Sequence, residues 1–284
     1  MVTQLTGKVV VITGGGQGIG AATAAALTRL GTRVVIGDLD QVRAEKTAAE
    51  LGADALPLDV TDTRGFTAFL DEVEHRFGPI DVLINNAGIM PLGLLEEEDD
   101  ATTRRQLEIN VHAVLHGTRE AAKRMRPRAS GHIVNVASFA GKAGLPGAAT
   151  YCATKHAVVG LSEAVHLELR GSGVNVSCVM PGIVRTELAS GLAEAKFFKS
   201  VRAEDVADAI AAALVRPRFE VFVPRSLGTM GKLTRLLPRR AGEAVARALK
   251  ADRILASAAH SSARADYEAR AAQSAPGAES GREK

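Results

Sequence analysis

The chain has 284 residues, 46% of them hydrophobic, so it can bury a complete core in a single domain. It contains no run of about 18 apolar residues, and residues 1–8 lack the charged-then-apolar pattern of a signal peptide, so we expect a cytoplasmic protein without a spanning helix. The formal net charge is +3, and residues 225–284 hold 12 Lys/Arg against 6 Asp/Glu, so the positive charge is concentrated in the C-terminal part.

Short runs rich in β-branched residues alternate with helical patterns from residue 8 onward. The runs that predict buried strands are residues 8–13, 33–37, 53–58, 80–84, 131–137, 174–180 and 220–223. Helical patterns cover about 20–30, 40–51, 62–77, 100–125, 150–170 and 203–215. This alternation predicts an α/β fold: a Rossmann-type, doubly wound parallel sheet of about seven strands in a single domain, with a C-terminal helical extension.

The helix expected at residues 100–125 has two notable features. Residues 96–100 are acidic and predict its solvated first turn, where negative charge meets the positive end of the helix dipole. His112 and His116 are four residues apart, a spacing that metal ligands can have, but we find no partners in the sequence that complete a site. We therefore interpret both histidines as packing or interface residues and predict no metal.

The first strand leads into a glycine-rich turn that contains Gly14, Gly18 and Gly20, followed by a helix. Glycines let the main chain approach a pyrophosphate, and a helix N-terminus offers free N–H groups and a positive dipole end. The spacing differs from Gly-x-Gly-x-x-Gly, and the alternative is a purely structural turn. We interpret the turn as part of a nucleotide site.

Asp38 follows the second strand, 24 residues after Gly14. A carboxylate at this position can accept hydrogen bonds from the adenosine ribose hydroxyls and would repel a 2′-phosphate. A role in the N-terminal cap of the next helix is the alternative and is compatible with the first. Because residues 14–20 include no Arg or Lys to neutralise a phosphate, the sequence favours NAD over NADP.

Tyr151 and Lys155 are four residues apart in a predicted helix and therefore share one of its faces. An ammonium beside a phenol favours the phenolate and lowers the tyrosine pKa from its ordinary value of about 10. Such a tyrosine can take a proton from an alcohol or give one to a ketone. For an isolated pair, the alternative is a solvated lysine and a half-buried aromatic residue.

The motifs together resemble the short-chain dehydrogenase/reductase family over about residues 5–224. They are, in order, Thr13-Gly14-Gly15-Gly16-Gln17-Gly18-Ile19-Gly20, Asp59-Val60, Asn85-Asn86-Ala87-Gly88, Asn110, Ser138, Tyr151-x-x-x-Lys155 and Pro181-Gly182. The resemblance implies an oxidoreductase that transfers hydride between NAD(H) and a secondary alcohol or its ketone. The alternative is a catalytically idle NAD-binding sensor or scaffold, for which the complete set of Asn110, Ser138, Tyr151 and Lys155 would be unnecessary.

The resemblance also implies a role for each catalytic position. Tyr151 would be the acid/base, and Lys155 would lower its pKa and bind the nicotinamide ribose. Ser138 would hold the substrate oxygen, and Asn110 would fix a water that relays protons to Lys155. Thr186 would lie near the nicotinamide carboxamide. The full set expected at the cofactor is Gly14, Gln17, Gly18, Ile19, Gly20, Asp38, Leu39, Asp59, Val60, Asn86, Ala87, Gly88, Tyr151, Lys155, Pro181, Gly182, Val184 and Thr186.

Apolar residues follow the Pro181-Gly182 turn and are expected to cover the substrate. We predict Leu145, Leu188 and Leu192 as substrate contacts beside Ser138 and Tyr151. Further apolar candidates are Met90, Phe139, Phe197 and Phe198. These residues favour an apolar alcohol or ketone, although a core role for about half of them is the alternative.

The C-terminal part goes beyond the usual span of the family. We expect a dinucleotide-binding and catalytic domain at 1–224, a basic helical extension at 225–273 and a disordered tail at 274–284. An apolar stripe and seven basic residues predict that 228–258 dock on the body or on another subunit; weak contact with a membrane surface is the alternative. The family resemblance implies a homotetramer or homodimer, and the scarcity of aromatics argues against nucleic-acid binding.

Overall fold

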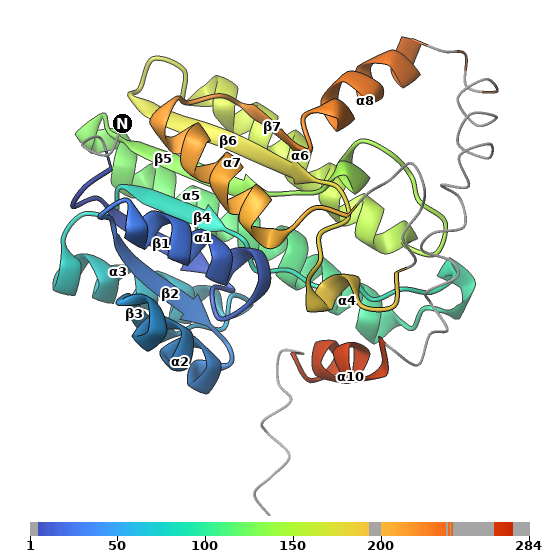
Figure 1. Cartoon of the computed structure of the whole chain (residues 1–284), viewed down its shortest axis with the longest axis horizontal. Coiled ribbons are helices and arrows are strands. Elements are labelled where there is room, and N and C mark those ends of the chain that lie inside the picture. The colour runs from blue at the N-terminus through green and yellow to red at the C-terminus, as the bar shows by residue number, and fades with distance from the viewer. Residues whose placement is uncertain (1–4, 193–199, 237, 239, 241–263, 275–284) are drawn as a thin grey trace, which may run out of the picture.

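The computed structural model describes residues 5–192, 200–236, 238, 240 and 264–274. Within these residues a seven-stranded parallel sheet has the order β3-β2-β1-β4-β5-β6-β7 (Figure 1). Its strands are β1 (Val9–Thr13), β2 (Arg33–Asp38), β3 (Asp54–Pro57), β4 (Val82–Asn85), β5 (Gly131–Val136), β6 (Val174–Pro181) and β7 (Glu220–Val223). This confirms the predicted doubly wound fold, in which the order reverses between β1 and β4.

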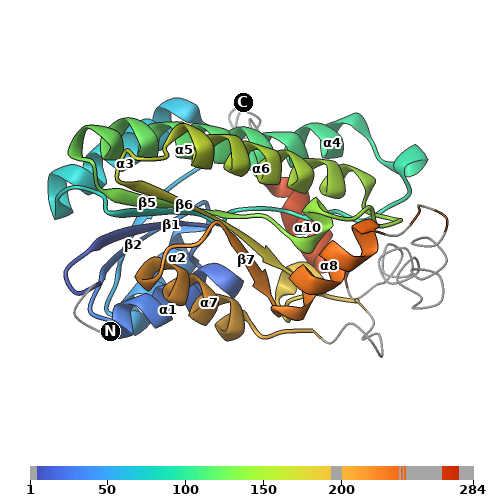
Figure 2. The same cartoon turned by 90° about the horizontal axis from the view of Figure 1, so that it is seen from above.

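Helices cover both faces of the sheet, as Figure 2 shows. One face carries α1 (Gly18–Arg29), α2 (Gln41–Leu51) and α7 (Ala203–Val215). The other carries α3 (Thr63–Phe77), α5 (Ala113–Met125) and α6 (Ala149–Glu168). Because both faces are covered, β1 and β4 are buried along their whole length, which explains why both are apolar up to their last residue. Full burial of one large side chain such as Phe66 stabilises the fold by about 1.5–3 kcal/mol.

The predicted long helix is interrupted. It consists of α4 (Asp100–Leu107), a π-helical turn at Glu108–His112, and α5. The prediction for residues 96–100 was wrong in part: Leu95–Glu97 form a separate 3₁₀ turn, and Asp99 caps α4 by accepting a hydrogen bond from the main-chain N–H of Thr102. The carboxylate of Asp99 therefore satisfies an otherwise free N–H group at the helix start.

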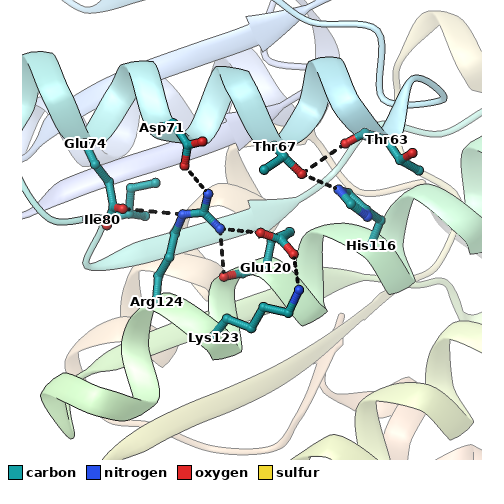
Figure 3. A network of polar contacts seen from close by, with 9 residues as sticks. All are labelled: Thr63, Thr67, Asp71, Glu74, Ile80, His116, Glu120, Lys123 and Arg124. Atoms are coloured by element: carbon teal, nitrogen blue, oxygen red, sulfur yellow. Dashed lines mark hydrogen bonds and ion pairs between the residues drawn. The ribbon is translucent and has the colours of Figure 1, made fainter.

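A polar network fastens α3 to α5 (Figure 3). Arg124 pairs with Asp71 and Glu74 of α3 and with Glu120 of its own helix, which also pairs with Lys123. Burial opposes ionisation of Glu120, but hydrogen bonds from Lys123 and Arg124 outweigh it and lower the pKa of this carboxyl.

His116 belongs to the same contact between α3 and α5. Its Nε2 lies 3.1 Å from the hydroxyl of Thr67, and its ring packs on Phe66. The packing interpretation of His116 is therefore confirmed, whereas His112 lies beside Glu108 at the surface. In the part of the chain that the structure describes, no group of three His, Cys, Asp or Glu side chains could hold a metal ion.

The C-terminal part includes two described helices, α8 (Ser226–Leu236) and α10 (Ala265–Gln273). Of the segment predicted to dock, 228–258, the structure describes the first residues within α8, whereas 241–258 lie outside the described residues, as does 275–284 of the predicted tail. No described helix is long and apolar enough to cross a membrane.

Candidate active site

In a doubly wound sheet, ligands bind outside the carboxyl ends of the strands where the strand order reverses, here at the loops that follow β1 and β4; we call this place the crevice. These loops touch: a Cβ on Gly14 would lie 2.8 Å from the Cα of Ala87. A Cβ on Gly20 would lie only 2.2 Å from the carbonyl oxygen of Gly14. Gly14 and Gly18 also have φ of 63° and 58°, which side chains disfavour. The turn thus requires its glycines, and it presents the start of α1, whose N-cap residue Gln17 makes no capping side-chain bond.

Asn86 supports the glycine turn. Its side-chain amide donates to the carbonyls of Thr13 and Gly14, at 3.0 and 2.9 Å. The main-chain N–H groups of Asn86 and Ala87 donate to the hydroxyl of Thr13. The side chain of Asn86 therefore holds the glycine turn in place. Thr13 holds the loop after β4 in the same way, a role that the sequence did not indicate.

Asp38 lies at the same turn. One carboxylate oxygen accepts the N–H of Gly16 at 2.8 Å and the other accepts the N–H of Asp40 at 3.1 Å. The cap of α2 is Asp40 itself, which accepts from the N–H of Arg43. The side chain of Arg43 contacts Gln17, so a cation does stand beside the turn; it pairs with Asp40 and Glu187. Local sequence did not indicate it, because Arg43 lies outside residues 14–20.

The residues predicted at the adenine end lie after β2 and β3. Asp59 accepts hydrogen bonds from both the N–H and the hydroxyl of Thr61, at 2.8 and 2.7 Å. Val60 is half-buried against the core, and Leu39 is 56% exposed, which is unusual for a leucine. These side chains leave apolar surface beside the crevice.

Ser138 and Tyr151 bring their hydroxyls together at the end of β5. The Ser138 hydroxyl lies close enough to the Tyr151 hydroxyl to lower its pKa, and it accepts the N–H of Ala140 at 3.1 Å. Tyr151 is 7% exposed at the start of α6. A chain of buried hydrogen bonds, from Asn85 to Asn135 to Ser162, joins α6 to β4 and β5 and so fixes the helix that carries the tyrosine.

Lys155 lies one helical turn after Tyr151, with its Nζ 5.6 Å from the centre of the tyrosine ring. The Nζ donates to the carbonyl of Val136 at 3.1 Å. Burial lowers the pKa of Lys155 to about 8. Burial likewise raises the pKa of Tyr151 to about 12, although the hydrogen bond from Ser138 acts in the opposite direction.

The direction of this shift in the pKa of Tyr151 is opposite to the expected lowering. The reason is physical: desolvation of the phenolate exceeds the stabilisation that a distant, itself desolvated ammonium can give.

Asn110 is fully buried in the π-helical turn. Its amide donates to the carbonyl of Ile89 at 2.8 Å and to the hydroxyl of Thr154 at 3.2 Å, and its oxygen accepts the N–H of Ile89 at 2.9 Å. The side chain thus supports the loop after β4. The expectation that Asn110 fixes a proton-relaying water stays a prediction; Asn110 lies near Lys155, across Gly88.

The segment after β6 faces the glycine turn. A Cβ on Gly18 would lie 3.4 Å from the Cγ2 of Thr186, so Thr186 lies beside the glycine turn; its place near the nicotinamide carboxamide stays a prediction. Pro181 and Val184 are buried, and the side chain of Val184 packs in the core beside α7 rather than toward the crevice. Gly182 is held by a hydrogen bond from its N–H to Val223.

The structure gathers the predicted substrate residues into one apolar cluster around Tyr151. The cluster consists of Met90, Leu92, Ala140, Leu145, Ala148, Tyr151, Cys152, Leu188 and Leu192. Phe139 instead lies toward Gly231 of α8, and Phe197 and Phe198 lie outside the described residues. The hydroxyls of Ser138 and Tyr151 therefore meet an apolar wall.

Helix α10 packs beside this cluster, which sequence reasoning did not foresee. Arg264 and Tyr267 bond to the loops that carry Met90 and Leu188. The composition could have drawn attention to Tyr267, because it is one of only two tyrosines in the chain, the other being Tyr151.

A glycine turn at the start of a helix, at the switch point of the sheet and with a hydroxyl pair and a lysine at the same edge, is the arrangement of a nicotinamide-dependent oxidoreductase. The family profile described as short chain dehydrogenase matches residues 8–196. The chain therefore belongs to the short-chain dehydrogenase/reductase family, whose members oxidise CH–OH groups or reduce the corresponding carbonyls.

Relatives with assigned activities are similar over most of their length. The 3-alpha-(or 20-beta)-hydroxysteroid dehydrogenase of Mycobacterium bovis is 38% identical over 194 residues, 67% of this chain and 74% of that protein. The sorbitol dehydrogenase of Cereibacter sphaeroides is 40% identical over 197 residues, 68% of this chain and 77% of that protein.

Solved structures agree with this assignment. A short-chain dehydrogenase/reductase from Burkholderia phymatum in complex with NAD has a TM-score of 0.74 at 30% identity and covers 82% of this chain and 94% of its own. Levodione reductase has a TM-score of 0.71 at 28% identity and covers 78% of this chain and 97% of its own.

Proposed function

We propose that the protein is an NAD(H)-dependent oxidoreductase that interconverts an apolar secondary alcohol and its ketone, with Tyr151 as the acid/base. The observation that carries this proposal is the hydroxyl pair of Ser138 and Tyr151, because Tyr151 is also a member of the apolar cluster. A group that can donate or accept a proton and an apolar surface that can bind a substrate thus lie together at Tyr151.

The residues present fit a dinucleotide, because the glycine turn leads into the start of α1, whose N-cap residue Gln17 makes no capping side-chain bond. When bound, the nicotinamide would supply or accept the hydride at the carbinol carbon. Ser138 would donate a hydrogen bond to the substrate oxygen. Tyr151 would give that oxygen a proton during ketone reduction and take one during alcohol oxidation.

Lys155 would set the ionisation of the tyrosine. As an ammonium it favours the phenolate that oxidation requires, whereas burial favours the neutral phenol that reduction requires. Alcohol oxidation should therefore accelerate as the pH rises, and ketone reduction should not. Lys155 and Thr186, on either side of the crevice, are the candidates to orient the nicotinamide.

We propose NAD rather than NADP because Asp38 faces the glycine turn with a carboxylate already oriented by Gly16. Arg43, the nearby cation, pairs with Asp40 and Glu187, which reduces its capacity to bind a 2′-phosphate. Titration of both reduced cofactors, followed by fluorescence, tests this preference. Tighter binding of NADPH by the unmutated chain would contradict it.

A panel of alcohols and ketones with NAD(H) tests the substrate class. It should include steroid, cyclic and long-chain ketones together with polyols, because the relatives named above include a hydroxysteroid and a sorbitol dehydrogenase. The apolar cluster around Tyr151 predicts higher kcat/KM for the apolar ketones. A clear preference for polyols would contradict this prediction.

We also propose a homotetramer or homodimer that buries the outer surface of α4–α6. Leu107 and Leu167 on these helices are 46% and 54% exposed, and such leucines favour a covered surface. Light scattering should give a multiple of 29.7 kDa; the mass of a single chain would refute the assembly.

For the C-terminal part we propose a division into the catalytic domain 1–224 and the extension 225–273. We propose docking on the protein rather than attachment to a membrane surface, because α10 buries Tyr267 and Ala271 against Ile89 and Ile109. Full-length protein should not float with anionic vesicles at low salt; salt-sensitive flotation would support the membrane alternative.

A further inference from the structure

Helix α10 joins two loops that are far apart in the sequence and both border the candidate substrate site. One is the loop after β4, which carries Ile89 and Met90; the other is the 3₁₀ turn Glu187–Ala189 after β6. In Figure 1, α10 (red) lies close to α4 at the end of the sheet where these loops emerge. The contact therefore spans the site from one side to the other.

Arg264 is the centre of this contact. Its side chain is 1% exposed although it carries a full charge. One terminal nitrogen donates to the carbonyls of Leu188 and Ser190, each at 3.0 Å, and the other donates to the carbonyl of Met90 at 2.7 Å. Its Nε pairs with Glu268 at 3.1 Å. A single planar guanidinium thus connects both loops through their main chains.

Tyr267 completes the attachment of Met90. The N–H of Met90 donates to the tyrosine hydroxyl at 2.6 Å, so α10 satisfies both main-chain polar groups of this residue. The ring of Tyr267 is buried beside Ile89 and Ile109, and the guanidinium of Arg264 lies 4.8 Å from its centre. The two side chains act on Met90 as a unit.

The residues held in this way belong to the apolar cluster around the candidate acid/base. Met90 and Leu188 both pack in the cluster that contains Tyr151. Their main chains depend on α10, whereas their side chains form the wall that a substrate would meet. A buried cation whose donors serve three main-chain carbonyls is costly unless those contacts are maintained, so the arrangement favours a defined loop geometry.

We propose that Arg264 and Tyr267 are positioning residues for the substrate site: by holding Met90 and Leu188 in place, they set the size of the apolar substrate that binds beside Tyr151. The inference rests on the proposed function only in naming the site as a substrate site. It assigns substrate selection to a helix outside the span of the family profile, which ends at residue 196.

Amide hydrogen exchange of the full-length protein tests the positioning without any substrate. Arg264→Met and Tyr267→Phe should each accelerate exchange at residues 88–92 and 186–192 by about tenfold or more, because the loops lose charge-assisted or neutral main-chain bonds. The matched control is Arg270→Met, on the same helix, since Arg270 makes an exposed ion pair with Glu187 and should have little effect. Unchanged exchange in both variants would overturn the proposal.

Steady-state kinetics test the selection of substrate, with cyclohexanone and the bulkier 2-decalone as probes. In Arg264→Met and Tyr267→Phe, KM for cyclohexanone should rise about tenfold while kcat changes less than about threefold, and the kcat/KM ratio of 2-decalone to cyclohexanone should increase. Arg264→Lys should restore only part of the effect, because an ammonium cannot serve both loops at once. NADH affinity should change less than about twofold.

The outcomes separate the two proposals. If no ketone is turned over but exchange accelerates at both loops, the proposed function fails and the positioning by α10 stands. If ketones are turned over and the variants lower kcat and NADH affinity equally for both probes, α10 has a general structural role and the proposal of substrate selection is refuted.

Discussion

Replacement of Lys155 by Met should stabilise the protein at neutral pH and abolish activity. Burial lowers the pKa of Lys155 from its ordinary 10.5 to about 8. At 1.36 kcal/mol per pKa unit, this difference makes the charged lysine cost about 3 kcal/mol in the folded state. The lost hydrogen bond to Val136 offsets about 1 kcal/mol of the gain, so the variant should be about 2 kcal/mol more stable at pH 7.

The pH dependence of the free energy of unfolding shows whether the buried charge of Lys155 causes the stability difference. Between about pH 8 and 10.5 the unfolded chain binds more protons at Lys155 than the folded chain does, so the stability of the parent rises with pH in this window. Lys155→Met removes this rise. The stability difference between variant and parent should therefore shrink by about 2 kcal/mol from pH 7 to pH 10.

Urea unfolding at pH 7 and at pH 10 measures the effect, because each curve gives a free energy of unfolding by linear extrapolation. Lys46→Met is the matched control: Lys46 is exposed on α2, and its replacement should change stability equally at the two pH values. A Lys155→Met protein that is less stable than the parent by the same amount at pH 7 and pH 10 would refute the reasoning.

The other predictions concern the cofactor crevice. Gly20→Ala should weaken NADH binding by more than about tenfold, because its Cβ would lie 2.2 Å from the carbonyl oxygen of Gly14; Gly160→Ala, with open space around it, is the control for fluorescence titration. Unchanged NADH binding by Gly20→Ala would mean that the glycine turn does not bind the dinucleotide. Asp38→Ala should reduce the preference for NADH over NADPH by about tenfold, since repulsion is removed while Arg43 remains. The same fluorescence titration measures the affinities for NADH and NADPH; an unchanged ratio of the two affinities in Asp38→Ala would contradict the prediction.

The fold was predictable because its signals are local. The apolar runs and the glycine turn each depend on neighbours in the sequence, and a parallel sheet places all carboxyl ends of its strands at one edge. Ser138 and Tyr151 were therefore expected to lie at the same edge, and the structure places the Ser138 hydroxyl close enough to Tyr151 to lower its pKa. The cluster of Leu145, Leu188 and Leu192 around Tyr151 was likewise predictable from their places after strands.

Other features depend on contacts that no local pattern reveals. Desolvation decides the pKa of Tyr151, and the degree of burial is known only once the chain is folded. Arg43 reaches the glycine turn from a helix that follows the next strand. Arg264 lies 174 residues from Met90 in sequence, so its bond to that carbonyl could not be derived from spacing.

Turnover by Tyr151→Phe is the most direct test of the central claim. The variant keeps the ring that packs in the apolar cluster and loses the hydroxyl that lies near Ser138. Tyr267→Phe, at the only other tyrosine, should raise KM as argued above but keep kcat within about threefold, so the comparison is made on kcat. The account predicts that Tyr151→Phe binds NADH within about twofold of the parent and reduces ketones at least about a thousandfold more slowly. Reduction at the parent rate would contradict the account.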